Sequence, residues 1–176
     1  YIYGTSSIVS AKESNAKIAE ERIEDTFGKS NQLVVMVPKG DYESEKRVLG
    51  KLDNLSYVTS TLGLANVSIN DDYVLTDKLN PRQFAELIDI DREVVDVLYM
   101  AYAYNQEQYG PVFTGVNDYE VPIIDMFLFL YDQYKEGYVT LDRDLDDKLN
   151  TLYDTLHDAQ LQLQGSDYSR FVLNLS

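Results

Sequence analysis

The first part of the chain combines one helical and one extended hydrophobic pattern. Residues 7–27 place apolar side chains at helical spacing among Lys and Glu, and Gly28 follows as a stop signal, which predicts an amphipathic helix. Residues 32–37 form a nearly continuous apolar run that ends at Pro38, and such a run is typical of a central strand covered on both faces. We therefore expect a helix followed by a strand.

A second helix and a second strand follow directly. Asp41 is a suitable N-cap, acidic residues in the next turn suit the positive end of the helix dipole, and residues 42–52 supply one apolar face. Residues 57–64 alternate between polar and apolar and are rich in β-branched side chains, which predicts a strand. The order strand, helix, strand indicates a βαβ or split βαβ unit.

The middle of the chain carries three helical patterns. A start signal with Pro81 at the first helical position predicts a helix over residues 81–88. Asp91 is expected to cap a second helix, and residues 110–117 are interpreted as a loop. A third helix, residues 122–137, is apolar over much of its circumference, so we expect it to be the most buried helix of this region.

The last helical pattern is the most regular one in the sequence. Apolar residues recur in alternating steps of four and three over residues 142–164, which predicts a helix with a heptad seam. The seam consists of Leu145, Leu149, Leu152, Leu156, Ala159 and Leu163. Because the seam is short for a free coiled coil, we expect its partner to be another helix of the same chain. Residues 170–176 then alternate like a strand.

This distribution of elements predicts the fold class and its organisation. Strands near the two ends and helices in the middle indicate an α+β domain with a large all-helical insertion. Residues 1–65 form the entry helix and the first strand, helix and strand of the core, and residues 66–165 form the helical insertion. Residues 166–176 then contribute a further core strand.

Composition narrows the classes of partner. The 176 residues contain 30 Asp and Glu against 15 Lys and Arg, which gives a formal net charge of −15. Nucleic acid is not expected as a partner, because its binding depends on Lys and Arg contacts with phosphate, and an anionic bilayer surface would also repel the domain. There is no Cys and only one His, so disulfides, cysteine-ligated metals and multi-histidine metal sites within one chain are excluded.

The lengths of the apolar stretches and the two ends of the sequence indicate whether the domain spans a membrane and whether it belongs to a longer protein. The longest apolar stretches fall short of the roughly 20 residues that a membrane-spanning helix requires. No signal-peptide pattern or Met precedes Tyr1, and the final strand stops without a turn or tail. We therefore expect the sequence to be a piece of a longer protein.

Two features could carry chemistry but have simpler interpretations. Asp142, Asp144 and Asp146 match the opening of a calcium loop, yet Asp147 replaces the required Gly and the twelfth position is not Glu. Carboxylates at the start of a helix are explained by the helix dipole, so no metal site is assigned. His157 is interpreted as a solvated or boundary residue, because no nucleophile motif accompanies it, and no glycine-rich motif indicates a phosphate cofactor. We assign no catalytic, cofactor-binding or metal residue.

Asparagine triplets and tyrosines are two further features of the sequence that could bear on function. The N-x-S triplets at Asn54, Asn66 and Asn174 match the glycosylation pattern, which matters only in a secretory eukaryotic context. The 15 tyrosines cluster in two groups, and a tyrosine suits either the edge of a helical core or contact with an amphiphilic ligand. The groups are Tyr99, Tyr102, Tyr104 and Tyr109, and then Tyr131, Tyr134 and Tyr138. Substrate-contact residues stay unknown, with Tyr99, Tyr102, Tyr131 and Tyr134 as the candidates.

Several segments together resemble the first extracytoplasmic domain of bacterial exporters of the RND superfamily, and most closely the MMPL-like (mycobacterial membrane protein large) type. The segments are YGTSSIVS, FGKSNQLVVMVPKGDYESEK, YVLTDKLNPRQFAELIDID, VPIIDMFLFLYDQY and RFVLNLS. The resemblance implies a ferredoxin-like porter core next to a membrane, with residues 171–175 as an inner strand of the sheet. The family's proton-relay carboxylates lie in membrane helices, so no catalytic residue is carried over.

The resemblance sets the functional expectation. It implies a non-enzymatic porter domain on the extracytoplasmic side of the cell membrane, in a proton-driven exporter of lipids, drugs or other amphiphiles. Its partners would be the transmembrane helices and the second extracytoplasmic domain of the same protein, which itself can be an oligomer. The alternative is a protein-protein interaction module that docks a partner or a second copy through its helical insertion. An enzyme ranks third, and no cofactor is expected.

Overall fold

The computed structural model describes residues 31–176, so the helix expected over residues 7–27 lies outside the described residues. The chain is mixed α+β with small antiparallel sheets and divides into two compact units. Among the described residues, the sheet unit contains residues 31–67 and 154–176, and the helical unit contains Ser68–Tyr153. The boundary between the two units after Tyr153 lies inside helix α7 (Arg143–Leu163), whereas the sequence pattern predicted that the helical insertion ends at residue 165.

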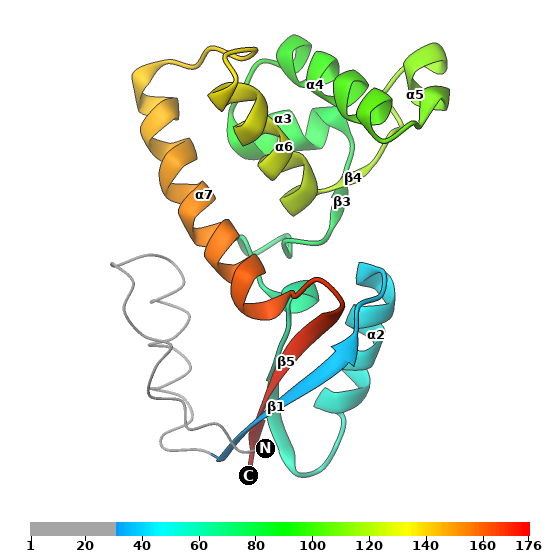
Figure 1. Cartoon of the computed structure of the whole chain (residues 1–176), viewed down its shortest axis with the longest axis vertical. Helices are drawn as coiled ribbons and strands as arrows, with labels where there is room; N and C mark the ends of the chain where they lie inside the picture. The colour runs from blue at the N-terminus through cyan, green and yellow to red at the C-terminus, as the bar shows by residue number, and fades with distance from the viewer. Residues whose placement is uncertain (1–30) are drawn as a thin grey trace. The chain divides into compact units, whose positions relative to one another are not determined.

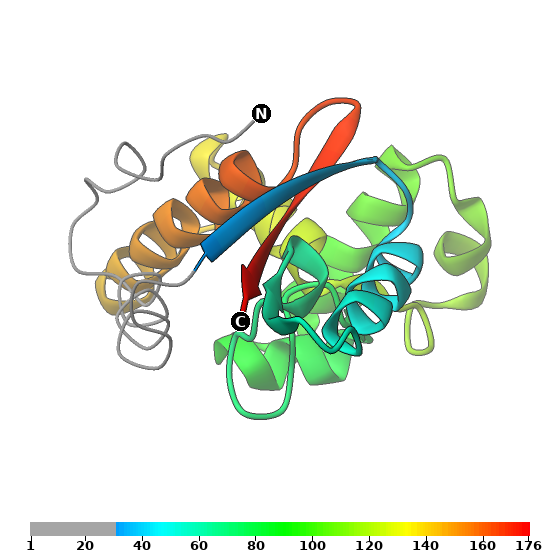
Figure 2. The same cartoon turned by 90° about the horizontal axis from the view of Figure 1, so that it is seen from below.

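The sheet unit contains a three-stranded antiparallel sheet in the order β1-β5-β2. Its elements are β1 (Asn31–Pro38), α2 (Tyr42–Asp53), β2 (Val58–Leu62), the short 3-10 helix η1 (Leu64–Asn66) and β5 (Tyr168–Leu175). Both β1 and β2 pair antiparallel with β5, so they run in the same direction on either side of it. Figures 1 and 2 show β1, β5 and the neighbouring helix α2 from two directions. The expected strands and helix of this unit are thus present.

One face of this sheet carries the core of the unit. Leu49 of α2, Phe171 and Leu173 of β5, and Val58 and Ala65 form one buried cluster. The helix approaches the sheet closely, because a Cβ at position 63 would lie 2.8 Å from both Leu49 Cδ1 and Phe171 Cδ1. Glycine at position 63 therefore provides space for the helix-sheet contact.

The expectation that residues 32–37 form a central strand covered on both faces is wrong. Among the strands of residues 31–176, β1 lies at the edge of the sheet and β5 is the central strand. Leu33, Val34 and Met36 are 45%, 45% and 59% exposed. A continuous apolar run indicates a strand, but it does not specify which strand lies in the middle of an antiparallel sheet.

The helical unit contains a two-stranded sheet and several helices. Its elements are β3 (Lys78–Leu79), α3 (Pro81–Ile88), α4 (Arg92–Asn105), α5 (Tyr109–Thr114), β4 (Val121–Pro122), α6 (Ile123–Lys135) and the first part of α7. The prediction of a loop over residues 110–117 is wrong for residues 110–114, which belong to helix α5. A proline in the first turn of a helix costs no hydrogen bond, so Pro111 is compatible with this short helix.

The core of the helical unit centres on α6. Five of its residues are at most 1% exposed, in agreement with the expectation for this apolar helix. They are Ile123, Ile124, Met126, Phe127 and Leu130. The side chains of the long helix α7 follow the heptad pattern, since Leu149, Leu156 and Leu163, seven residues apart, are buried. Within the described residues, no helix is both long enough and apolar enough to cross a membrane.

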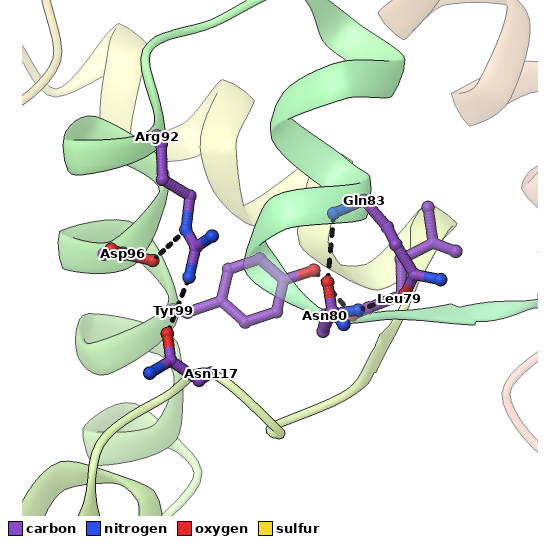
Figure 3. Close-up of polar contacts among 7 residues, drawn as sticks. All are labelled: Leu79, Asn80, Gln83, Arg92, Asp96, Tyr99 and Asn117. Atoms are coloured by element: carbon purple, nitrogen blue, oxygen red, sulfur yellow. Dashed lines mark hydrogen bonds and ion pairs between the residues drawn. The ribbon is translucent and has the colours of Figure 1, made fainter.

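Two helix starts differ from one another in their capping. The Asn80 side chain accepts a hydrogen bond from the backbone N–H of Gln83 at 3.0 Å, and the Gln83 side chain accepts one from the N–H of Asn80 at 3.0 Å, which completes a capping box (Figure 3). Asp91 precedes α4, but its side chain makes no capping hydrogen bond. The expected cap by Asp91 is therefore absent. Arg92 instead fixes this end of α4 by pairing with Asp96 at 2.6 Å and Asn117 at 2.7 Å.

Candidate functional site

An open groove of about 570 Å³ lies at the end of α4 in the helical unit. It is formed where the last turns of α4 meet the start of α5, the middle of α6 and the segment after α6. The residues that line it are Ala101, Tyr104, Asn105, Glu107, Tyr109, Phe129, Gln133 and Tyr138. Half of these residues are aromatic, and the only charged one is Glu107.

Aromatic rings form one part of the groove. Tyr104 and Tyr109 meet edge to face, with ring centroids 5.8 Å apart and an interplanar angle of 71°. Phe129 makes a similar contact with Tyr102 at 5.3 Å. Tyr104, Tyr109 and Tyr138 are 67%, 47% and 76% exposed, so large parts of these rings remain in water.

Polar side chains form the other part of the groove. In the part of the chain that the structure describes, the side chains of Asn105, Glu107 and Gln133 make no hydrogen bond or ion pair. Glu107 lies in the turn between α4 and α5 with φ of 57°, a left-handed conformation that is uncommon for a residue other than glycine. The groove therefore presents one carboxylate and two amides that can bind a ligand.

The turn that carries Glu107 is held by neighbouring bonds. The backbone N–H of Gln108 donates to the carbonyl of Ala103 at 2.8 Å, and the Glu107 N–H donates to the carbonyl of Tyr104 at 3.0 Å. Tyr119 donates from its hydroxyl to the Gln108 side chain at 2.5 Å. These bonds fix the backbone around Glu107 without using its carboxylate.

Charge is distributed unequally between the two units. Residues 68–153 contain 18 Asp and Glu and 6 Lys and Arg, and 6 minus 18 gives −12 of the total charge of −15. Among the described residues that line the groove, none is Lys or Arg. The groove therefore lies in the strongly negative part of the chain, and the field around it attracts cations.

Tyr99 is not available as a substrate contact, contrary to the sequence-based suggestion. Its side chain is 0% exposed, and its hydroxyl donates to the backbone carbonyl of Leu79 at 2.8 Å (Figure 3). Its ring contacts Phe84 and Tyr119 edge to face. Burial raises the pKa of Tyr99 far above its ordinary value. Tyr99 thus fixes α4 to the end of β3.

The other suggested tyrosines also take part in packing. Tyr102 is half-buried against Phe129, and burial, with smaller effects from Asp125 and Tyr119, raises its pKa to about 12. Tyr131 stacks on Tyr153, with ring centroids 3.6 Å apart and nearly parallel planes. The structure thus separates these tyrosines from the exposed ones in the groove.

The contact between α6 and the start of α7 uses Tyr131 and Tyr134. Tyr131 donates to the side chain of Asn150 at 3.2 Å, and the Tyr134 hydroxyl donates to Asp146. That hydrogen bond is the largest cause of the raised pKa of Tyr134. These side chains join α6 to the first half of α7, and none of them belongs to the predicted heptad seam, so a helical partner for that seam stays a prediction.

The acidic segment at the start of α7 has a structural role. Asp142 accepts a hydrogen bond from the backbone N–H of Leu145 at 2.9 Å, which caps the helix. Asp144 and Asp146 lie in the first turn, where the helix dipole favours carboxylates. Across residues 31–176, no three His, Cys, Asp or Glu side chains form a group that could hold a metal ion. His157 is half-buried on α7.

The three asparagines of the glycosylation triplets differ in accessibility. Asn174 is 3% exposed and donates to Ser60 at 2.8 Å. Asn66 accepts from the N–H of Gly63 at 2.8 Å, so its side chain is also engaged in the fold. Asn54 is exposed at the end of α2. A glycan at Asn66 or Asn174 would break these bonds.

Sequence reasoning placed Tyr104, Tyr109 and Tyr138 in the tyrosine clusters but missed the other five groove residues. These are Ala101, Asn105, Glu107, Phe129 and Gln133. Phe129 lies in a helix in which most of the apolar residues are buried, so its sequence position carried no distinguishing signal. Glu107 lies in a polar segment between two helices, and only the turn geometry brings it to the aromatic side chains. No protein-family model, curated protein or solved structure matches this chain.

Proposed function

We propose that this chain is the first extracytoplasmic porter domain of a proton-driven membrane exporter of the RND superfamily, of the MMPL-like type. Its role is to form part of the path for lipids, drugs or other amphiphiles, without catalysing a reaction. Its partners are then the transmembrane helices and the second extracytoplasmic domain of the same protein. The domain lies on the extracytoplasmic side of the cell membrane.

The order of the strands is the observation that carries this proposal. The two parallel strands β1 and β2 are connected through α2 and separated by the antiparallel strand β5. This strand order supports the proposal, because a split βαβ unit, on which a ferredoxin-like porter core is built, also has an antiparallel strand between its two parallel strands. Strand β5 contains residues 171–175, which the family resemblance implied as an inner strand, and the helical unit is inserted between β2 and β5.

The location of the domain is tested with a single cysteine, since this chain contains none. Val97, 62% exposed on α4, is replaced by Cys in the full-length protein, with any other cysteine removed. A membrane-impermeant maleimide should label Val97→Cys in intact cells, and the cysteine-free protein is the control. Labelling only after cell lysis would contradict the extracytoplasmic location.

Export is tested in the same cells. Cells that express the full-length protein should accumulate less of a fluorescent amphiphile than cells that lack it. Addition of a protonophore should abolish this difference, because proton movement is the proposed energy source. Equal accumulation with and without the protein, across a panel of cationic, neutral and anionic amphiphiles, would contradict the export function.

A second candidate function, an interaction module, is favoured by an exposed apolar stripe. Val94, Val97 and Met100 on α4 are 38%, 62% and 36% exposed, and Phe113 on α5 is 85% exposed. The charge of the helical unit disfavours a second copy and favours a partner with Lys and Arg around an apolar centre. A thiol-reactive cross-linker at Val97→Cys should then trap one defined basic partner, whereas Ser166→Cys, at an exposed residue of the sheet unit, should trap none.

A further inference from the structure

The groove at the end of α4 combines exposed aromatic side chains with polar side chains that make no hydrogen bond or ion pair among the described residues. Tyr104 and Tyr138 are 67% and 76% exposed, so much of each residue is accessible to a ligand in water. The face of an aromatic ring carries partial negative charge, which attracts a cation placed over it. The exposed rings therefore provide a surface that suits a cation with an apolar body.

The charges around the groove select the sign of the ligand. Glu107 is the only charged residue among those that line the groove, and the helical unit as a whole carries −12. An anionic ligand would approach a carboxylate in a negative field without a compensating Lys or Arg. A cation gains from both the local carboxylate and the surrounding field.

The number of acidic side chains selects between kinds of cation. A divalent metal ion requires several oxygen ligands converging on one point. Among the described residues, no such group of three or more acidic or histidine side chains exists. A quaternary ammonium group requires no oxygen cage and is recognised by aromatic faces and a single carboxylate.

We propose that this groove binds organic cations of the quaternary ammonium class, with Tyr104, Tyr109 and Tyr138 around the cation and Glu107 as its counter-charge. The amides of Asn105 and Gln133 then bind a polar group attached to the cation. The inference names a substrate class for the transport path and in that respect rests on the proposed function. The turn that holds Glu107 is fixed by the bonds of Gln108 described above.

Choline and its uncharged isostere, 3,3-dimethylbutan-1-ol, test the inference on the 176-residue chain in solution. The two compounds have nearly the same shape, so a difference in affinity reports the cation. Choline should bind saturably, with shifts in the NMR signals of the rings of Tyr104, Tyr109 and Tyr138, and the isostere should bind at least about tenfold more weakly. Equal affinity for the two compounds, or no saturable binding of choline, would overturn the inference.

Matched substitutions separate the groove from the general charge of the chain. Glu107→Gln keeps the side-chain shape and should weaken choline binding about five- to tenfold, whereas Glu93→Gln, at the other end of α4, should change it less than about twofold. If both variants weaken binding equally, the general field and not the groove is responsible. Tyr104→Leu should weaken binding about two- to fivefold, and Tyr104→Phe should retain it, because only phenylalanine keeps the ring.

The choline-binding and export experiments together distinguish a failure of the cation-site inference from a failure of the exporter proposal. If choline does not bind to the chain while the full-length protein exports amphiphiles from cells, the inference of a cation site is wrong and the proposed export function stands. If choline binds with the expected effects of Glu107→Gln and Tyr104→Leu while no export is detected, the site stands and the exporter proposal is wrong.

Discussion

The hydroxyl of Ser169 on β5 donates a hydrogen bond to Oε1 of Glu45 on α2, and both residues are buried, at 1% and 3% exposed. The second oxygen, Oε2, is buried without a hydrogen-bond partner among the described residues. A buried carboxylate oxygen without a partner loses its hydration and gains nothing in return. The single bond from Ser169 is therefore the main compensation for burying Glu45 between helix and sheet.

Ser169→Ala should destabilise the chain by about 1–3 kcal/mol, because it removes the hydrogen bond that the buried Glu45 carboxylate accepts from Ser169. The double variant Glu45→Met/Ser169→Ala removes both polar groups and should recover most of the loss, since a matched apolar pair has no hydration to lose. Urea unfolding followed by circular dichroism measures both effects. Ser166→Ala, which removes an exposed serine hydroxyl, is the control. A Ser169→Ala variant as stable as the wild type would contradict this account of the pair.

Gly63→Ala should destabilise the sheet unit by about 1–3 kcal/mol through overpacking. The new Cβ would lie 2.8 Å from side-chain carbons of both Leu49 and Phe171, which are buried in the core. Gly50→Ala is the matched control, because no atom lies within 4 Å of a Cβ at that position in α2. Alanine in a helix interior should stabilise the chain by about 0.5–1 kcal/mol. Opposite signs of the two changes in urea unfolding are expected, and a shared sign would contradict the packing argument.

Local signals in the sequence were sufficient for most elements of the fold. The start signal with Pro81 predicted helix α3 with its observed bounds, and the heptad pattern predicted the long helix α7. Both signals act within a few residues, so one sequence contains all the information they require. The place of β1 at the edge of its sheet depends instead on pairing with β5, at least 130 residues away, and no local pattern encodes that pairing.

The groove was only partly predictable for the same reason. The tyrosine clusters indicated the right region, yet Tyr99 is buried whereas Tyr104, in the same helix and cluster, is 67% exposed. The two residues differ in which face of α4 they occupy, and only the packing of α3 and α6 decides which face is covered. Glu107 joins the tyrosines through a turn with positive φ, which a glutamate does not signal in sequence.

Asn80→Ala should cost about 1 kcal/mol of the free energy of unfolding, because it removes a side chain that accepts a hydrogen bond from the backbone of α3. Asp91→Ala changes the N-cap position of the next helix, where the side chain makes no capping bond, and should cost less than about 0.5 kcal/mol. Thermal unfolding of the two variants beside the wild type measures the difference. Equal losses would show that the capping box of α3 does not contribute as its geometry indicates.

Alkaline pH should destabilise the helical unit through its buried tyrosines. Burial raises the pKa of Tyr102 from the ordinary value of 10.0 to about 12, and the pKa of Tyr99 and Tyr119 is raised by the same cause. A raised pKa means that the folded state favours the neutral hydroxyl. The stabilisation is therefore fully present below the unfolded-state pKa of 10.0 and is lost as the pH rises from there through the folded-state value of about 12.

Tyr102→Phe isolates one of these groups. Phenylalanine keeps the ring contact with Phe129 but does not ionise, so the free energy of unfolding should fall less steeply between pH 10.0 and about 12 than in the wild type. Urea unfolding at several pH values in this window measures the slope, and absorbance at the tyrosinate band follows ionisation in the folded chain. Tyr57→Phe, at a residue that is 56% exposed, is the matched control for loss of one hydroxyl. An unchanged slope in Tyr102→Phe would show that ionisation of Tyr102 is not linked to unfolding.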